Sequence, residues 1–301
     1  MIIAISGVAG YEIISHSLAG GSSVIPVVMV PPSIYPTPSM QVTGLSTTAS
    51  LNPATPAQVT GPPSDPFAGT PAEAWADGAA GIVIPQAQQT GPYTAAQVQA
   101  AYETTRQLLI AAHLDPQTLN GGLPVAYANL LQPLVRNAFW ANLNTVGVNN
   151  DGAPLSTRAW VTSFAPGTTV LIGNVIKVAG TMSAQPETNP LIEGGQALDI
   201  VVNYRFVYPV EPPGDPGAWM RVVGIASGKV RFSPSSNGGP LLPWDDTAPA
   251  VAGARCDSVD GYVHPDYANG PPENVQASGP PFDPYDLNEV PAGYCQETTG
   301  T

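Results

Sequence analysis

The sequence predicts an α+β domain in which helices pack on one face of an antiparallel sheet. Amphipathic helical patterns occupy residues 94–140, and alternating patterns typical of strands follow as far as residue 232. The link between the last two strand patterns, residues 211–217, reads EPPGDPG, which is turn sequence throughout and predicts a hairpin. Helices followed by a run of antiparallel strands are typical of α+β folds.

The helices are predicted from their ends and from their apolar faces. Thr94 and Gln97 have the spacing of a capping box at the start of the first long helix, and Asp115-Pro116 ends that helix and begins another turn. A second helix is predicted for residues 124–140, where Pro133 should kink or divide it. The residues expected on the buried face of the first helix are Val98, Ala101, Tyr102, Thr105, Leu108, Leu109 and Ala112.

Three segments with a two-residue period predict the strands. They are residues 169–182, 197–210 and 219–232, and Gly224 and Gly228 suggest bulges or bends in the last of them. The first strand should place Val170, Ile172, Ile176 and Val178 on one face. The second should place Ile200, Val202, Tyr204, Phe206 and Tyr208 on one face, with Asn203 and Arg205 opposite.

The chain before the domain divides into an apolar leader, residues 1–30, and a proline-rich linker, residues 31–65. The leader has no Lys or Arg, and it contains Glu12 and His16, so it fits neither a secretory signal nor a complete spanning helix. We interpret it as the remnant of a membrane anchor; the alternative is an arm that packs on the domain or on a partner. The linker should be extended, partly in polyproline II, and act as a semi-rigid stalk for the α+β domain of residues 66–301.

Composition limits the classes of partner. The net charge is −13, the pI is about 4.3 and charged residues make up 10% of the chain. Such a chain is repelled by phosphate backbones and by anionic membrane surfaces, so we expect no nucleic-acid partner.

The two cysteines, Cys256 and Cys295, both lie in the loop-rich C-terminal segment of about residues 250–301. They have neither the C-x-x-C spacing of redox sites nor the neighbours of a zinc site. We therefore predict one disulfide that tethers this segment. Such a bond indicates that the protein matures outside a reducing cytosol.

Several motifs resemble those of uncharacterised membrane-anchored or secreted proteins of actinobacteria. They are TPAEAWADGAAGIVIP and LLIAAHLDPQTL in the first half of the chain, and VAGTMS, VVNYRFVYPV and DGYVHPDY in the second. Together they lie between residues 65 and 267. The resemblance implies a cone-shaped fold similar to nuclear transport factor 2, in which helices close one side of a curved sheet. It implies no particular reaction.

Relatives of that shape use the space between helix and sheet for small ligands. The residues that would line such a pocket here are Tyr102, Leu109, Tyr204, Phe206 and Tyr208. His113 ends the first long helix, where an imidazole is expected to interact with the helix C-terminus rather than to act in catalysis.

A second candidate site is the segment DSVDGYVHPD. Its carboxylates and imidazole belong to Asp257, Asp260, His264 and Asp266, and they could hold a divalent cation such as calcium, although the spacing is not that of an EF-hand. The alternative is a turn-rich cover held by the disulfide, with a turn at Asp260-Gly261. No cofactor is predicted.

The sequence contains no nucleophile elbow, and neither cysteine has a histidine neighbour, so we lean toward a protein without enzymatic activity. The main hypothesis is an extracytoplasmic domain, tethered to the membrane by its stalk, with an interaction or structural role in the cell envelope. One alternative is a small-molecule binder or enzyme that uses the cone pocket. Another is a virion or surface-assembly subunit that uses residues 1–30 as an arm. The expected partner is therefore an envelope or assembly protein, in an oligomeric state that the sequence leaves open.

Overall fold

The computed structural model describes residues 61–150, 152–188, 195–233, 242–245, 250–273, 281–291 and 296–299. The leader, nearly all of the proline-rich linker and Cys295 lie outside these residues. The predicted anchor, arm and stalk therefore stay predictions.

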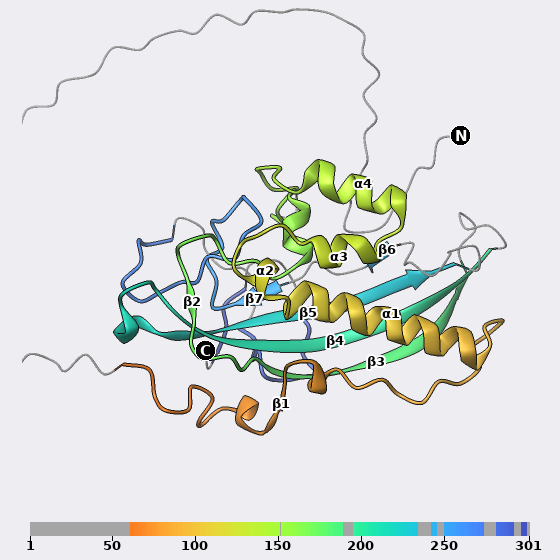
Figure 1. Cartoon of the computed structure of the whole chain (residues 1–301), viewed down its shortest axis with the longest axis horizontal. Helices are drawn as coiled ribbons and strands as arrows, with labels where there is room; N and C mark the ends of the chain where they lie inside the picture. Colours follow the sequence, from red (N-terminus) through yellow and green to blue (C-terminus); the bar gives the residue numbers. More distant parts are fainter. Residues whose placement is uncertain are drawn as a thin grey trace, which may run out of the picture. The chain divides into compact units, whose positions relative to one another are not determined.

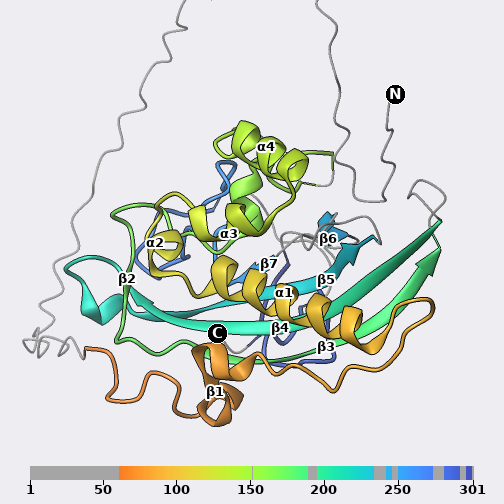
Figure 2. The same ribbon diagram turned by 45° about the vertical axis from the view of Figure 1, so that its right-hand side comes forward.

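The described part is an α+β domain, as predicted, and every pairing between its strands is antiparallel. The strands follow the order β1-β3-β4-β5-β6, with β2 also paired to β4 and β7 to β5. Long strands β3, β4 and β5 form the body of the sheet and curve together (Figures 1 and 2). The strands are β1 (Ala76–Asp77), β2 (Val170–Leu171), β3 (Lys177–Thr188), β4 (Gln196–Glu211), β5 (Met220–Phe232), β6 (Leu242–Asp245) and β7 (Ala250–Ala252).

Helix α1 lies along one face of the β3–β5 sheet. Helices α3 and α4 lie on the side of α1 that faces away from the sheet (Figure 1). The α-helices are α1 (Ala95–His113), α2 (Pro116–Leu119), α3 (Val125–Leu130) and α4 (Pro133–Asn142). Short 3-10 helices are η1 (Pro71–Ala74), η2 (Gly78–Gly81), η3 (Thr157–Trp160) and η4 (Pro216–Ala218). None of the described helices is long and apolar enough to cross a bilayer.

The predicted helix signals are confirmed. The Gln97 N–H donates to Thr94 Oγ1 at 3.3 Å, and the Thr94 N–H donates to Gln97 Oε1 at 2.9 Å, which completes the capping box. All seven residues predicted on the inner face of α1 are buried. Asp115 caps α2 through the Thr118 N–H at 3.0 Å, and Pro133 begins α4 where the second predicted helix divides.

The prediction of one strand across residues 169–182 is wrong. Val170 and Leu171 pair with the C-terminal end of β4, whereas Lys177–Thr188 pair with β4 from Val207 back to Gln196. The chain turns between these two pairings, at Gly173, which has a φ of +71°. Long-range pairing therefore overrides the local alternation.

The β4–β5 ladder has no bulge at Gly224 or Gly228, but the register of β5 with β6 shifts between Lys229 and Arg231. The β4–β5 ladder runs without a shift from Leu198–Phe232 to Val210–Met220, and the hairpin predicted through residues 211–217 joins its strands. A Cβ on Gly224 would lie 3.2 Å from the Tyr208 ring and 3.3 Å from Thr162 Oγ1. Glycine at this position therefore makes room for a polar cluster described below.

The second face of the sheet is covered by both ends of the domain. Phe67 and Ala72 from the N-terminal end, and Phe282 and Tyr285 from the C-terminal end, pack with apolar residues of β4, β5 and β7. The described strand β4 is therefore buried on both faces. The residues predicted opposite its apolar face include Arg205, which has no exposed surface.

Arginine side chains hold the irregular segments in place. Arg106, Arg136, Arg158, Arg205, Arg221 and Arg255 donate to backbone carbonyl oxygens, and Arg231 pairs with Asp199. Burial lowers the pKa of the Arg205 guanidinium to about 10, so it stays protonated at neutral pH.

Candidate ligand-binding pocket

The five residues predicted to line a cone pocket do lie together, but they form packed core. Leu109, Tyr204, Phe206 and Tyr208 are 0% exposed and Tyr102 is 5% exposed, so side chains fill the volume between α1 and the sheet. The tyrosine hydroxyls are also used internally. Tyr102 accepts from the Ala184 N–H at 2.9 Å, and Tyr208 donates to the His113 carbonyl at 2.9 Å. The prediction of a pocket at these residues is wrong.

The predicted metal ligands separate into two groups. Asp257 accepts two hydrogen bonds from Arg255, at 2.5 and 2.9 Å, and Asp266 lies 3.9 Å from the same guanidinium. Asp260 instead lies 3.1 Å from His264 Nε2 and accepts from the Tyr262 N–H at 3.0 Å. In the described ranges no three His, Cys, Asp or Glu side chains could hold a metal ion. The metal hypothesis is therefore wrong for these four residues. The Asp260–Tyr262 hydrogen bond fits the predicted turn at Asp260-Gly261, and the disulfide-held cover stays a prediction.

The predicted disulfide stays a prediction. Cys256 is half-buried, and its backbone N–H donates to Glu273 Oε1 at 2.7 Å. No free cysteine is present among the described residues. Cys295 lies outside them.

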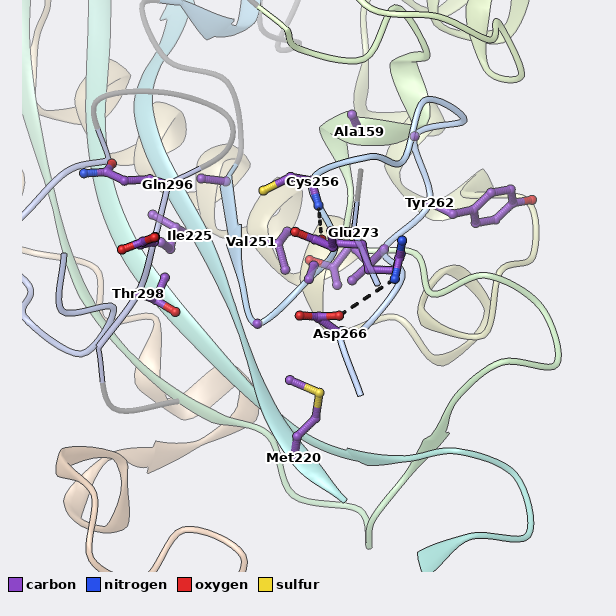
Figure 3. Close-up of a pocket in the computed structure, with 18 of the residues that line it drawn as sticks. Ala159, Met220, Ile225, Val251, Cys256, Tyr262, Asp266, Glu273, Gln296 and Thr298 are labelled. Atoms are coloured by element: carbon purple, nitrogen blue, oxygen red, sulfur yellow. Dashed lines mark hydrogen bonds and ion pairs between the residues drawn. The ribbon is translucent and has the colours of Figure 1, made fainter. Parts of the chain in front are cut away.

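A pocket of about 500 Å³ opens elsewhere, beside the edge where β5 pairs with β7. This volume is in the range of small-molecule sites. Figure 3 shows Gln296 and Thr298 at one end of the pocket, Asp266 and Glu273 at the other, and Met220 below them. The wall is assembled from η3, the β4–β5 connection, β5, β7 and the C-terminal segments, which are far apart in the sequence.

One part of the wall is apolar. Trp219 directly precedes β5, Met220 begins it and Ile225 lies in its middle. Val251 belongs to β7, and Val161 follows η3. The Arg221 guanidinium lies 5.0 Å from the Trp219 ring centre but does not line the pocket. These side chains offer an apolar surface to a ligand.

The other part of the wall is acidic. Among the described residues that line the pocket, Arg255 is the one arginine, and the carboxylates are those of Asp266, Glu273 and Glu297. Hydrogen bonding to Asp257 raises the pKa of the Arg255 guanidinium above its ordinary value. Its Nη1 also donates to the Pro271 carbonyl at 2.5 Å. Arg255 is therefore engaged by the protein itself.

A buried polar cluster lies at the inner wall, where His113 and Thr162 line the pocket. His113 Nδ1 lies 2.9 Å from Thr162 Oγ1, and the Tyr208 hydroxyl lies 3.2 Å from the same oxygen. The His113 ring also stacks on Phe206, with ring centres 4.4 Å apart. Burial lowers the pKa of His113 to about 3, so the imidazole is neutral at physiological pH. The sequence predicted that this imidazole would interact with the helix C-terminus; in the structure it bonds Thr162 and stacks on Phe206 in the core.

The low pKa of His113 makes stability depend on pH. Below about pH 6.5 the unfolded chain binds a proton at this imidazole and the folded chain does not, so the free energy of unfolding falls as pH falls toward 3. The expected slope is up to about 1.4 kcal/mol per pH unit. Urea unfolding between pH 7 and 5 should show this slope, and His113→Gln should reduce it. Equal slopes in the two proteins would contradict this account.

Sequence reasoning missed the pocket residues. Trp219, Met220, Val251 and Glu273 belong to segments that meet only through the sheet pairing, and none stands in a recognisable motif. The one available signal was Arg255, since arginine is scarce in this chain and this one directly precedes Cys256 and Asp257.

Comparisons with known proteins found no matching family model, no matching curated protein and no matching solved structure.

Proposed function

We propose that the chain is a non-enzymatic extracytoplasmic domain, tethered at the cell envelope by its N-terminal region, that binds another envelope component. The observation that carries this proposal is the filled volume between α1 and the sheet. Tyr204, Phe206 and Tyr208, which would surround a substrate in an open cone, are fully buried. His113 beside them is 2% exposed and is held neutral by burial.

The use of the arginines supports a protein partner. Six of them bind carbonyl oxygens of the chain itself and Arg231 pairs with Asp199, so the basic groups serve the fold rather than a phosphate-binding surface. The net charge of −13 favours partners with basic surfaces.

For the finer fold, we propose a cone of the nuclear transport factor 2 type whose interior is closed by side chains. The curvature of β3–β5 around α1 supports this proposal (Figure 2).

The oxidation state of the two cysteines tests the proposed compartment. In protein isolated from its native host under non-reducing conditions, Cys256 and Cys295 should react with an alkylating reagent only after reduction, as mass spectrometry of their peptides would show. A cytosolic thiol protein from the same cells is the control, and it should react without reduction. Free thiols at both cysteines would overturn the extracytoplasmic assignment.

The pocket beside β5 and β7 favours a second candidate function, the binding of a small group by the same non-enzymatic domain. Its volume of about 500 Å³ and its mixed apolar and polar wall are those of a ligand site.

A further inference from the structure

The acidic end of the pocket carries excess negative charge next to a guanidinium that is already engaged. The Arg255 guanidinium is bonded to Asp257 and lies 3.9 Å from Asp266, and Glu273 also acts on it electrostatically. Of these three carboxylates, those of Asp266 and Glu273 line the pocket, so the single positive charge of Arg255 is outnumbered. Because the Arg255 donors are bound to Asp257 and to a carbonyl oxygen, few of them remain for an anionic ligand.

The remaining groups at this end are mostly acceptors. The Asp266 side chain is 49% exposed, so its carboxylate is available to a ligand. Glu273 accepts one hydrogen bond from Cys256 and keeps further acceptor capacity. His113 adds no positive charge, because it is neutral at physiological pH.

The apolar wall next to these acceptors sets the shape of the rest of the ligand. Met220, Val251 and Ala254 line the same pocket, and aliphatic stems pack well on such side chains. A ligand that fits both walls has a cationic end and a short aliphatic stem, as a lysine side chain does.

We propose that this pocket binds an alkyl cation, an ammonium or guanidinium group on an aliphatic stem, with the cation against Asp266 and Glu273 and the stem against Met220 and Val251. The proposal rests on the ligand-binding function proposed above. Such a cation has two sources: a lysine or arginine side chain of a partner protein, and a free alkylamine.

Met220 provides a local readout for the test. The full-length protein is labelled with 13C in its methionine methyl groups, and the Met220 signal is assigned by its loss in Met220→Leu. The labelled protein is titrated separately with n-pentylamine, n-pentanol and pentanoate. We expect a saturable Met220 shift with n-pentylamine at neutral pH, a weaker effect of pentanol, and no saturable shift with pentanoate. Affinity for the amine should fall with added salt.

Two variants with the same loss of charge separate a local from a general effect. Asp266→Asn should lower the affinity for n-pentylamine about fivefold, which is the effect expected from losing a partly exposed ion pair. Glu103→Gln removes an exposed carboxylate on α1 that bonds Gln99, and it should leave the affinity unchanged. Equal weakening by both variants would mean a general electrostatic effect and would overturn the proposal.

A peptide pair identifies the source of the cation. Tighter binding of acetyl-Gly-Lys-Gly-amide than of n-pentylamine, with no binding of the norleucine analogue, supports a partner's side chain; the reverse order supports a free amine. Equal shifts with pentylamine and pentanol, or no saturable Met220 shift with any compound, would overturn the proposal. That failure would leave the cysteine result intact, so the two proposals are tested separately.

Discussion

Arg231→Met is expected to lower the free energy of unfolding by about 3–5 kcal/mol, the cost of removing one partner of a buried ion pair. The Arg231 guanidinium binds both oxygens of Asp199 at 2.8 Å, and the two side chains are 8% and 0% exposed. Without the guanidinium, the Asp199 carboxylate is buried and loses its counterion. Urea unfolding followed by circular dichroism measures the change.

The control is the double variant Asp199→Leu/Arg231→Met. Replacing a whole buried pair by apolar residues costs little, so we expect the double variant to recover most of the stability lost in the single one. If the double variant is as unstable as Arg231→Met, the loss comes from packing around Arg231 rather than from the unpaired charge.

Arg205→Met is expected to release the segment Phe282–Glu289 from the sheet and to lower stability by about 2–4 kcal/mol, because hydrogen bonds that involve a charged group are worth about 1.5–3 kcal/mol. The guanidinium donates to the carbonyls of Pro284, Asp286 and Glu289. Hydrogen–deuterium exchange should show lost protection in this segment while β4 and β5 stay protected.

Arg221→Met is the matched control. Arg221 donates to the carbonyls of Pro66 and Ala68, in the N-terminal segment of the domain. Its loss should raise exchange near residues 66–70 and leave residues 282–289 protected. Release of both segments by either variant would show that they open together, and that Arg205 is not a specific anchor.

The helices could be predicted because their signals are local. The capping box at Thr94 and Gln97, the stop at Asp115 and the division at Pro133 each act within a few residues. The β4–β5 hairpin was predictable for the same reason, since its turn sequence joins its strands directly.

The strands around residue 175 and the candidate site could not be predicted in this way. Whether Val170 joins β3 or pairs separately with β4 depends on contacts with residues about forty positions away. The alternating pattern predicts that Arg205 points to solvent. In the structure the C-terminal segment packs over Arg205 and buries it.

The sequence by itself determined the α+β class, the ends of the helices, the hairpin and the acidic, arginine-poor character of the chain, because these depend on local periodicity, turn chemistry and composition. Only the tertiary structure decided that the space under α1 is filled, that both faces of β4 are buried, and that a pocket opens beside β7. Those outcomes depend on how side-chain volumes from distant segments fit together, and this fit is set when the sheet pairs and both ends of the domain close over it.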